Sequence, residues 1–347
     1  MIELLSTKMV KTFVAIRKDE ISSLASSIRS MRGSTINMTE KISLFSNYII
    51  CRSAFGKICK DRDEFITILK EILLLTGGFD VADLFPSWKL QDNRAHKKVD
   101  IVMEEILNEH IENKAAGKKG NGEFGDEDLV DVFLRVKENA ELQFPITNDH
   151  IKAVIFVSLL RTLAMIIIFK NSDIMAKAQS EVRRIFKGKK KYDEEDFEEL
   201  TYLKLVVKEA LRVHLPAPLI TPRKCREQTN INRYIIPIKT RVLVNAWALA
   251  RDPQSWVTLK VLYQRDLRTR LLTSKEITLR RRMCPEMLFG LANVTHPLAQ
   301  LLLHFKWDLP NGTNSKDLDM TETGGIATTK KKNLLLVATC HRNEEEF

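Results

Sequence analysis

Glycine and proline are scarce in this sequence, with 13 and 10 of them among 347 residues. Both residue types interrupt helices, so their scarcity permits long regular segments, which here are rich in leucine, isoleucine, lysine and glutamate. Hydrophobic residues make up 44% of the chain, enough to bury a sizeable core as one large domain or as two. The composition therefore predicts a mainly α fold.

Paired cysteines are also lacking. The five cysteines are Cys51, Cys59, Cys225, Cys284 and Cys340. Their number is odd and no C-x-x-C pair occurs, which argues against a disulfide framework or a structural zinc site and suits a reducing compartment. His214, His296 and His304 lack zinc spacing, so we expect surface or satisfied core histidines at these positions.

A signal peptide and a clear membrane span are missing from the pattern. The first residues hold no apolar segment of signal-peptide length and no cleavage site. The apolar stretch at 153–169 is short for a span and carries Arg161 at its middle, where an arginine costs about 2.5–3.5 kcal/mol on insertion. We interpret this stretch as a buried helix, with membrane insertion as the weaker alternative.

The net charge of +10 points to an acidic partner. Nucleic acid, membrane headgroups and an acidic protein all suit a basic chain. The sequence shows no basic stripe interleaved with aromatic residues and no nucleic-acid motif, so nucleic acid is the weakest of the three.

Hydrophobic periodicity locates the expected helices. They are predicted at 39–55, 97–113, 173–186, 202–214 and 287–303. Thr39 is the expected N-cap of the first helix. The apolar face of the second helix is expected to contain Val99, Val102, Ile106 and Ile111.

Two small hairpins and one loop complete the predicted elements. Alternating β-branched residues predict hairpins at 233–244 and 324–340, with a short helix after the first. Repeated glycines predict a loop at 114–128. The fold class is therefore mainly α with small β hairpins.

Glu209 and Arg212 stand three residues apart on one face of an otherwise apolar helical segment. An ordinary exposed pair of this kind contributes about 0.2–0.5 kcal/mol and implies no function. The apolar neighbours favour burial instead, and a buried pair needs further hydrogen bonds to offset desolvation.

Cys284 lies between arginines and an apolar helical segment. An inert core cysteine is the simplest interpretation, since free cysteine is among the most buried residue types. Two features favour a thiolate instead, namely the charge of Arg282 and the N-terminus of the helix predicted from Met287. Without a catalytic histidine motif nearby, a metal ligand is favoured at least as much as a nucleophile.

An ordered series of motifs surrounds these residues. E-x-x-R at Glu209 and Arg212 precedes P-x-P-L-x-x-P-R, which ends at Arg223; A-x-x-R-D-P and a Cys-Pro before "LFGLAN" follow. Earlier stretches such as "LLLTGGFDVADLFPSWKL" belong to the same pattern, which covers most of the chain. E-x-x-R alone is weak, but the combination is strong. The chain resembles the plant cytochrome P-450 family, and most of all its terpenoid-hydroxylating branch.

The resemblance assigns a role to each of these residues. It implies haem b as cofactor, with Cys284 as the axial thiolate on iron, a ligand that favours O–O cleavage. Arg282 would pair with a haem propionate, and Arg223 would face one as well. Glu209 and Arg212 would form the structural pair that braces the haem-binding loop.

The resemblance also implies a fold, an activity and partners. The fold would be that of cytochrome P-450 without its N-terminal part, as a single domain at 1–347. The activity would be NADPH- and O₂-dependent hydroxylation of a small apolar, terpenoid-like substrate, with electrons from NADPH-cytochrome reductase and no nucleic-acid partner. The family works at the cytosolic face of the endoplasmic reticulum membrane; without the family's anchor, a cytosolic chain is the alternative.

The chain departs from the family pattern at two functional motifs. The cysteine loop F-x-x-G-x-R-x-C-x-G has Ile277, Arg280 and Glu286 at its phenylalanine and glycine positions. Those glycines let the backbone approach the iron-bound sulfur. The oxygen-activating A-G-x-[DE]-T-[TS] motif is replaced by "VSLLRTLAMIIIF", so no acid–alcohol pair is identifiable as catalytic.

The segment at 257–280 fits the family only in another reading frame. With allowed synonymous codons read one nucleotide earlier, "LKVLYQRDLRT" becomes E-S-F-I-P-E-R-F-E-N, which contains the family's P-E-R-F motif. We therefore expect 257–280 to be out of frame and disordered. Three interpretations remain open: a haem monooxygenase, a degenerate fragment without catalysis, and a helical protein that binds an acidic partner.

Overall fold

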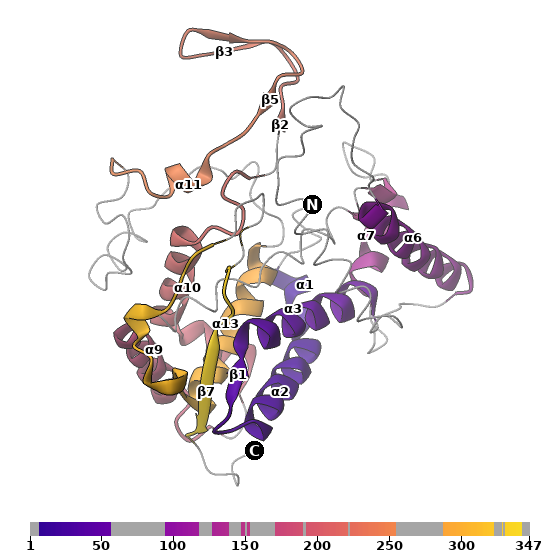
Figure 1. The fold of residues 1–347 in the computed structure, drawn as a ribbon. Coiled ribbons are helices and arrows are strands. Elements are labelled where there is room, and N and C mark those ends of the chain that lie inside the picture. Colours follow the sequence, from indigo (N-terminus) through magenta and orange to yellow (C-terminus); the bar gives the residue numbers. More distant parts are fainter. Residues whose placement is uncertain are drawn as a thin grey trace.

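The part of the chain that the computed structural model describes is interrupted by gaps. It comprises residues 7–56, 94–117, 127–138, 147–149, 151–152, 171–189, 192–220, 223–254, 287–322, 328 and 330–341. Within these ranges helices predominate and the sheets are small, which confirms the predicted fold class (Figure 1).

Helices and strands alternate irregularly along the chain. The α-helices are α1 (Thr7–Thr12), α2 (Val14–Ser30), α3 (Met38–Phe55), α6 (Arg94–Ala115), α7 (Leu129–Glu138), α9 (Ser172–Ile185), α10 (Thr201–Val213), α11 (Ala246–Leu249) and α13 (Met287–His304). The 3₁₀ turns are η2 (Glu194–Glu199), η4 (Pro310–Gly312) and η5 (Ser315–Asp317). The strands are β1 (Thr35–Asn37), β2 (Arg223–Lys224), β3 (Thr229–Ile231), β4 (Tyr234–Ile236), β5 (Arg241–Val242), β6 (Phe305–Asp308) and β7 (Leu335–Cys340).

Helix α13 lies at the centre of the core. Its sequence is apolar on nearly every side, and such a helix is stable in water when other elements cover it. Helices α2, α9 and α10 pack against it, and Leu298 and Leu302 are completely buried. The helix begins at Met287, three residues after Cys284, so the core anchors the chain immediately beyond the candidate ligand.

A three-stranded antiparallel sheet in the order β1-β7-β6 joins the two ends of the described chain (Figure 1). Strand β6 alternates, with Phe305 and Trp307 buried and Lys306 and Asp308 exposed. Trp307 lies opposite Ala338, and Ile36 lies opposite Leu336. This period of two places one face of the sheet on the core.

Both predicted hairpins differ from the observed strand pairing. Instead of a hairpin over 233–244, β3 pairs with β4, and β5 pairs with β2. The turn between β3 and β4 consists of Asn232 and Arg233, both at positive φ (49° and 71°), as a twisted two-residue hairpin turn requires. The hairpin at 324–340 is wrong as well, because β7 pairs with β1 and β6, strands that are distant in sequence.

The N-cap predicted for α3 is also wrong. Asn37, not Thr39, caps the helix, and its side chain accepts a hydrogen bond from the Glu40 backbone N–H at 3.3 Å. The Thr39 hydroxyl instead accepts a bond from the Leu334 N–H at 2.8 Å. Thr39 thereby connects the helix to the end of the chain, which no local pattern indicates.

Helix α6 exposes one residue that was assigned to its buried face. Ile111 is 42% exposed, whereas Met103, Ile106 and Leu107 are buried. The buried stripe continues to His110, which is 1% exposed. The buried face of α6 thus ends at the polar residue His110 and not at Ile111, so it is rotated about the helix axis from the predicted face.

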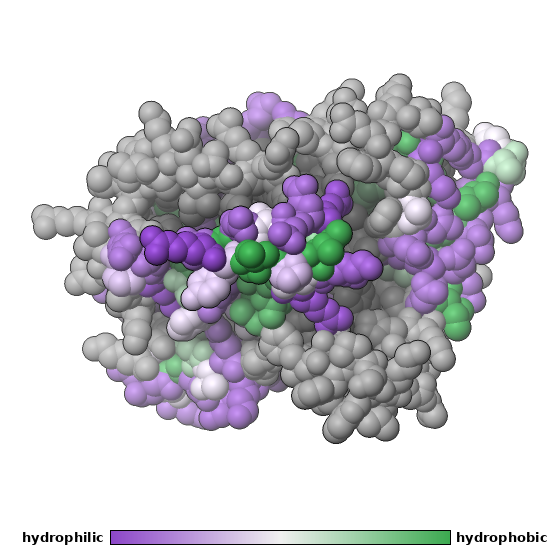
Figure 2. All heavy atoms as spheres, turned by 90° about the horizontal axis from the view of Figure 1, so that it is seen from above, coloured by the Kyte–Doolittle hydropathy of each residue, from purple (hydrophilic) through white to green (hydrophobic). Residues whose placement is uncertain are grey.

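The surface carries an exposed apolar hairpin. Ile231, Tyr234, Ile235 and Ile238, on or next to β3 and β4, are each more than half exposed. Figure 2 looks onto this end of the molecule and shows hydrophobic and hydrophilic side chains interspersed on it. Among the helices that the structure describes, none is both long enough and apolar enough to cross a membrane. The predicted buried helix at 153–169 lies outside the described residues.

Candidate functional site

Helix α10 carries the E-x-x-R pair and is fixed at both ends. Its apolar residues Leu203, Val206 and Ala210 are completely buried. At its N-terminus, Glu181 of α9 accepts hydrogen bonds from the backbone N–H groups of Tyr202 (2.8 Å) and Leu203 (2.9 Å). A carboxylate at this end satisfies free donors and complements the helix dipole. Helix α9 therefore positions α10.

Glu209 and Arg212 form a two-pronged ion pair. Arg212 donates from Nε to Glu209 Oε2 at 2.8 Å and from Nη2 to Oε1 at 2.5 Å. The Arg212 side chain is 8% exposed and that of Glu209 is 18% exposed. Arg212 is therefore buried and Glu209 partly buried, and paired bonds of this geometry are the strong kind that can offset desolvation.

A second arginine completes what we call the arginine clasp: Glu209, Arg212 and Arg251 with the carbonyls of Val213 and Ala250. Arg212 donates from Nη1 to the Ala250 carbonyl at 2.5 Å, and Arg251 donates from Nη2 to the Val213 carbonyl. Each arginine thus bonds the residue next to the other. The clasp ties the C-terminus of α10 to the end of α11.

Arg251 is held in place by further contacts. Its guanidinium lies 4.2 Å from the centre of the Trp247 ring, a cation–π contact. Burial lowers the pKa of Arg251, and the nearby charge of Arg212 lowers it further, against the opposite effect of Glu322. Glu322 is in turn paired with His214 Nδ1. The C-terminal segment therefore supplies a second negative charge near the clasp, in addition to that of Glu209.

The three histidines singled out in the sequence are all accounted for locally. His214 pairs with Glu322, and His304 Nε2 lies 3.0 Å from Gln300 Oε1. His296 stacks on Phe197 with 4.2 Å between ring centres. Burial, with the charges of Arg17 and Lys204, lowers the pKa of His296 to about 3, so this ring is neutral.

The structure brings some of the predicted site residues together and leaves others apart. Glu209 and Arg212 meet, and their helix packs against α13. Arg223 lies half-buried on β2, opposite Val242, and no ion pair between described residues joins it to the clasp. Cys284 and Arg282 lie outside the described residues, as do the segments 153–169 and 257–280.

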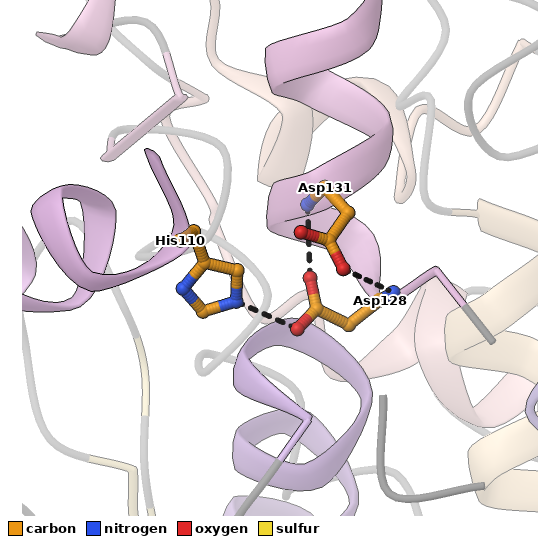
Figure 3. Close-up of side chains that lie close together, drawn as sticks. All are labelled: His110, Asp128 and Asp131. Atoms are coloured by element: carbon orange, nitrogen blue, oxygen red, sulfur yellow. Dashed lines mark hydrogen bonds and ion pairs between the residues drawn. The ribbon is translucent and has the colours of Figure 1, made fainter. Parts of the chain in front are cut away.

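A buried histidine–aspartate cluster was not predicted from the sequence (Figure 3). His110 of α6 and Asp128, the residue before α7, are each 1% exposed. Asp128 and Asp131 cap α7 reciprocally: Asp131 N–H donates to Asp128 Oδ1 at 2.9 Å, and Asp128 N–H donates to Asp131 Oδ2 at 3.3 Å. The D-x-x-D pattern before an apolar run is the sequence signal for this cap.

Both ring nitrogens of His110 have partners. Nδ1 lies 2.7 Å from the Ile106 carbonyl, and Nε2 lies 2.7 Å from Asp128 Oδ2. Burial lowers the pKa of His110, but the bond to and charge of Asp128, the Ile106 carbonyl and the charge of Asp131 outweigh it and raise the pKa. Burial raises the pKa of Asp128 despite the opposing effect of His110.

The three side chains could also be considered as metal ligands, since their ligand atoms lie within 4.8 Å of one another. A zinc ion bound to a histidine nitrogen and a carboxylate oxygen would be about 2.0–2.2 Å from each and would hold the two atoms more than about 3 Å apart. The separation of 2.7 Å between His110 Nε2 and Asp128 Oδ2 is that of a direct hydrogen bond. The cluster as it stands is therefore closed by a proton.

Comparison with known proteins decides the family. The family model described as Cytochrome P450 matches residues 1–258, well over half of the chain. The chain belongs to the cytochrome P450 family. As a cytochrome P450, it is assigned to the haem monooxygenases.

Curated plant enzymes are similar to this cytochrome P450 over nearly its whole length. Premnaspirodiene oxygenase from Hyoscyamus muticus is 47% identical in an alignment of 370 positions that covers 99% of this chain and 74% of the relative. The 5-epiaristolochene 1,3-dihydroxylase of Nicotiana tabacum is 45% identical, over 99% of this chain and 73% of its own. Both names describe oxygenation.

Solved structures confirm the fold. A zebrafish cytochrome P450 solved with abiraterone superposes with a TM-score of 0.78 at 16% identity, over 98% of this chain and 80% of that chain. Identity this low supports the shared fold alone. The clasp therefore lies within a cytochrome P450 framework.

Proposed function

We propose that this chain has the haem-binding architecture of a terpenoid-hydroxylating monooxygenase, with Cys284 as the axial iron ligand. The observation that supports this most directly is the buried ion pair of Glu209 and Arg212. Its helix packs on α13, which begins three residues after Cys284. A brace of this kind is of use where an adjacent loop must keep one conformation.

The residues suit haem in part. A thiolate is a soft ligand for iron, and arginines are suitable partners for propionates, which favours Cys284 with Arg282 and Arg223 in these roles. Arg212 donates hydrogen bonds from Nε, Nη1 and Nη2 to Glu209 and to the Ala250 carbonyl. We therefore assign it a bracing role and assign propionate binding to other arginines. When bound, haem b would supply the activation of dioxygen for hydroxylation.

The substrate and partners follow from the relatives. We assign a small apolar, terpenoid-like substrate, since relatives that are 47% and 45% identical carry the names premnaspirodiene oxygenase and 5-epiaristolochene 1,3-dihydroxylase. NADPH would be the electron source, through a flavoprotein reductase that docks on a basic face, in keeping with the net charge of +10. The cytosolic face of the endoplasmic reticulum membrane is the proposed location.

A second candidate is a chain that keeps this fold but does not turn over. The residues that favour it are Arg280 and Glu286, which occupy glycine positions of the cysteine loop. The arginine of P-E-R-F, which in the family completes the network of Glu209 and Arg212, is absent from 257–280. On this second candidate, the chain as written would bind haem poorly and hydroxylate nothing.

Haem content per chain separates the two candidates. Three proteins would be expressed side by side: the written chain, a repaired chain, and the Cys284→Ala variant of the repaired chain. The repaired chain has 257–280 read in the family's frame and the loop glycines and the oxygen-activating motif restored. The repaired chain should bind haem and, when reduced with CO, give the red-shifted Soret band of thiolate ligation. Cys284→Ala made in the repaired chain should abolish that band.

Two outcomes would contradict these proposals. If the repaired chain kept the red-shifted band after Cys284→Ala, Cys284 would not be the ligand. If the written chain carried near-stoichiometric haem and formed product with NADPH, the departures would be tolerated variation. Sequencing the locus from Trp256 to Pro285 would then show whether the frame disruption is present in the gene or is an error in the inferred protein sequence.

A further inference from the structure

The contact between His110 and Asp128 contains a proton that neither residue carries in its ordinary neutral-pH state. The Ile106 carbonyl can only accept a hydrogen bond, so His110 Nδ1, 2.7 Å away, must be the donor. In a neutral ring the proton on Nδ1 leaves Nε2 with a lone pair. That lone pair would face Asp128 Oδ2, also an acceptor, at 2.7 Å.

Two acceptors at this distance inside a protein repel each other, and both residues are only 1% exposed to water. A proton between Nε2 and Oδ2 removes the conflict and converts the contact into a charge-assisted hydrogen bond. Imidazole is a stronger base than carboxylate, so the proton belongs to the ring. His110 is then a buried imidazolium.

The position of this imidazolium gives it a mechanical role. Helix α6 packs against α7, and α7 packs against α3 of the core. In Figure 1, α6 lies at the periphery of the molecule with α7 beside it. Asp128 is simultaneously the N-cap of α7 and the partner of His110, so a single carboxylate connects the cap to the outer helix (Figure 3).

We propose that protonated His110 is a latch that holds α6 on the N-terminus of α7, and that loss of its proton releases α6. Released, the neutral ring would present a lone pair to Asp128, and the buried contact would separate or admit water. This inference does not depend on haem binding or on the proposed activity.

The charges around the latch define the direction of its pH response. Asp128 and Asp131 face His110 from the N-terminus of α7. Elsewhere between the two helices, Lys114 pairs with Glu138 at the surface. Arg135 of α7 pairs with Glu127, which precedes the same helix. Because the pKa values of His110 and Asp128 are both raised, the folded contact binds more protons than the open one. The latch is therefore closed below the ordinary histidine pKa and opens as the pH rises through the raised one.

Nuclear magnetic resonance of the ring nitrogens tests the proton directly. The full chain would be labelled with ¹⁵N-histidine, and the His110 signals would be assigned by their loss in His110→Gln. We expect both His110 nitrogens to be protonated at pH 7, with a titration midpoint above about 6.5, the ordinary histidine value. A lone-pair nitrogen at Nε2 at pH 7 would overturn the proposal.

Asp128→Asn is the matched variant, because asparagine also caps a helix and can donate from its amide to Nε2. It should make His110 neutral at pH 7 and move its titration below that of the parent chain. An unchanged His110 charge in Asp128→Asn would contradict the pairing. Should this variant fail to fold, the titration of the parent chain decides alone. If adding one equivalent of Zn²⁺ shifted the His110 signals, a metal ion and not a proton would occupy the site. That result would also overturn the proposal.

Hydrogen exchange of α6 tests the release. After correction for intrinsic rates, exchange of the α6 amides should rise about tenfold per pH unit above the His110 midpoint. In His110→Gln, which keeps a neutral donor in place of Nε2, this dependence should vanish. Lys114→Gln removes the exposed ion pair between the same helices and should retain it. Corrected exchange that is independent of pH in the parent chain would show that His110 is no latch.

Discussion

Two ion pairs among the described residues, that of Glu209 with Arg212 in the arginine clasp and that of His110 with Asp128 in the latch, differ in how their cation can respond. Arg212 cannot lose its proton in a protein, so a broken clasp would leave a charge buried beside α10. His110 can lose its proton and become neutral. Burial and distance alone therefore do not determine what an ion pair contributes to stability. When the carboxylate is removed, a strongly basic cation stays charged and destabilises the fold, whereas a histidine can release its proton.

Removing Glu209 should have the largest effect on this comparison. Glu209→Ala leaves the Arg212 guanidinium, 8% exposed, without its carboxylate. We expect a loss of about 3–5 kcal/mol in the free energy of unfolding, which denaturant titration measures. The matched control is Glu198→Ala, which removes an exposed partner of Lys204 and should change stability by less than about 0.5 kcal/mol. A loss as small as the control's would show that the clasp is open to water.

Removing Asp128 should cost less. Asp128→Ala deletes the N-cap of α7 and one charge-assisted bond, but His110 can release its proton and become a neutral buried ring. We expect a loss of about 2–3 kcal/mol at neutral pH. Stability should also cease to fall with rising pH through the raised pKa of His110, because the group that titrates there has lost its partner. A loss as large as that of Glu209→Ala would contradict the role given to proton release.

Breaking the second half of the clasp should be milder still. Arg251→Gln removes the bond to the Val213 carbonyl and the contact with Trp247, while the pair of Glu209 and Arg212 remains. We expect a loss of about 1–2 kcal/mol in the free energy of unfolding. Arg251→Lys serves as the control for charge, since lysine keeps the charge without the planar donor group. If Arg251→Lys were as stable as the parent chain, charge rather than geometry would explain the clasp.

The smallest effect is expected at the surface of the same helix pair. Glu138→Gln breaks the exposed ion pair with Lys114 between α7 and α6. Exposed pairs contribute little, so unfolding free energy should change by less than about 0.5 kcal/mol. Thermal unfolding of Glu138→Gln and Asp128→Ala, measured under the same conditions, would compare the surface pair with the latch. A loss above about 1 kcal/mol would mean that the surface pair, as well as the latch, holds α6 against α7.

Local pattern predicted the helices well. The segments 39–55, 173–186 and 202–214 agree with α3, α9 and α10 to within one residue at each end. These helices have an apolar stripe of helical period, and that period is a property of neighbouring residues. The burial of Glu209 and Arg212 was predictable for the same reason, because their helical neighbours are apolar.

Pairing between distant segments was not predictable. The sequence alone indicated that 324–340 contains a strand, but not that β7 would lie between β1 and β6. Strand partners are chosen by tertiary packing, and many distant strands would suit an apolar, β-branched strand equally well. The exchange of Thr39 for Asn37 as N-cap has the same origin, since Leu334 competes for the Thr39 hydroxyl.

The sequence by itself determined the helical fold, the family motifs and the buried E-x-x-R pair, because each depends on residues within a few positions of one another. Tertiary structure alone decided two other features: the reciprocal bonds between Arg212 and Arg251, and the meeting of His110 with Asp128. Their partners lie 38 and 18 residues apart in sequence. In both features, burial brings polar groups together away from water. The arginines then donate to backbone carbonyls, and His110 and Asp128 share a proton.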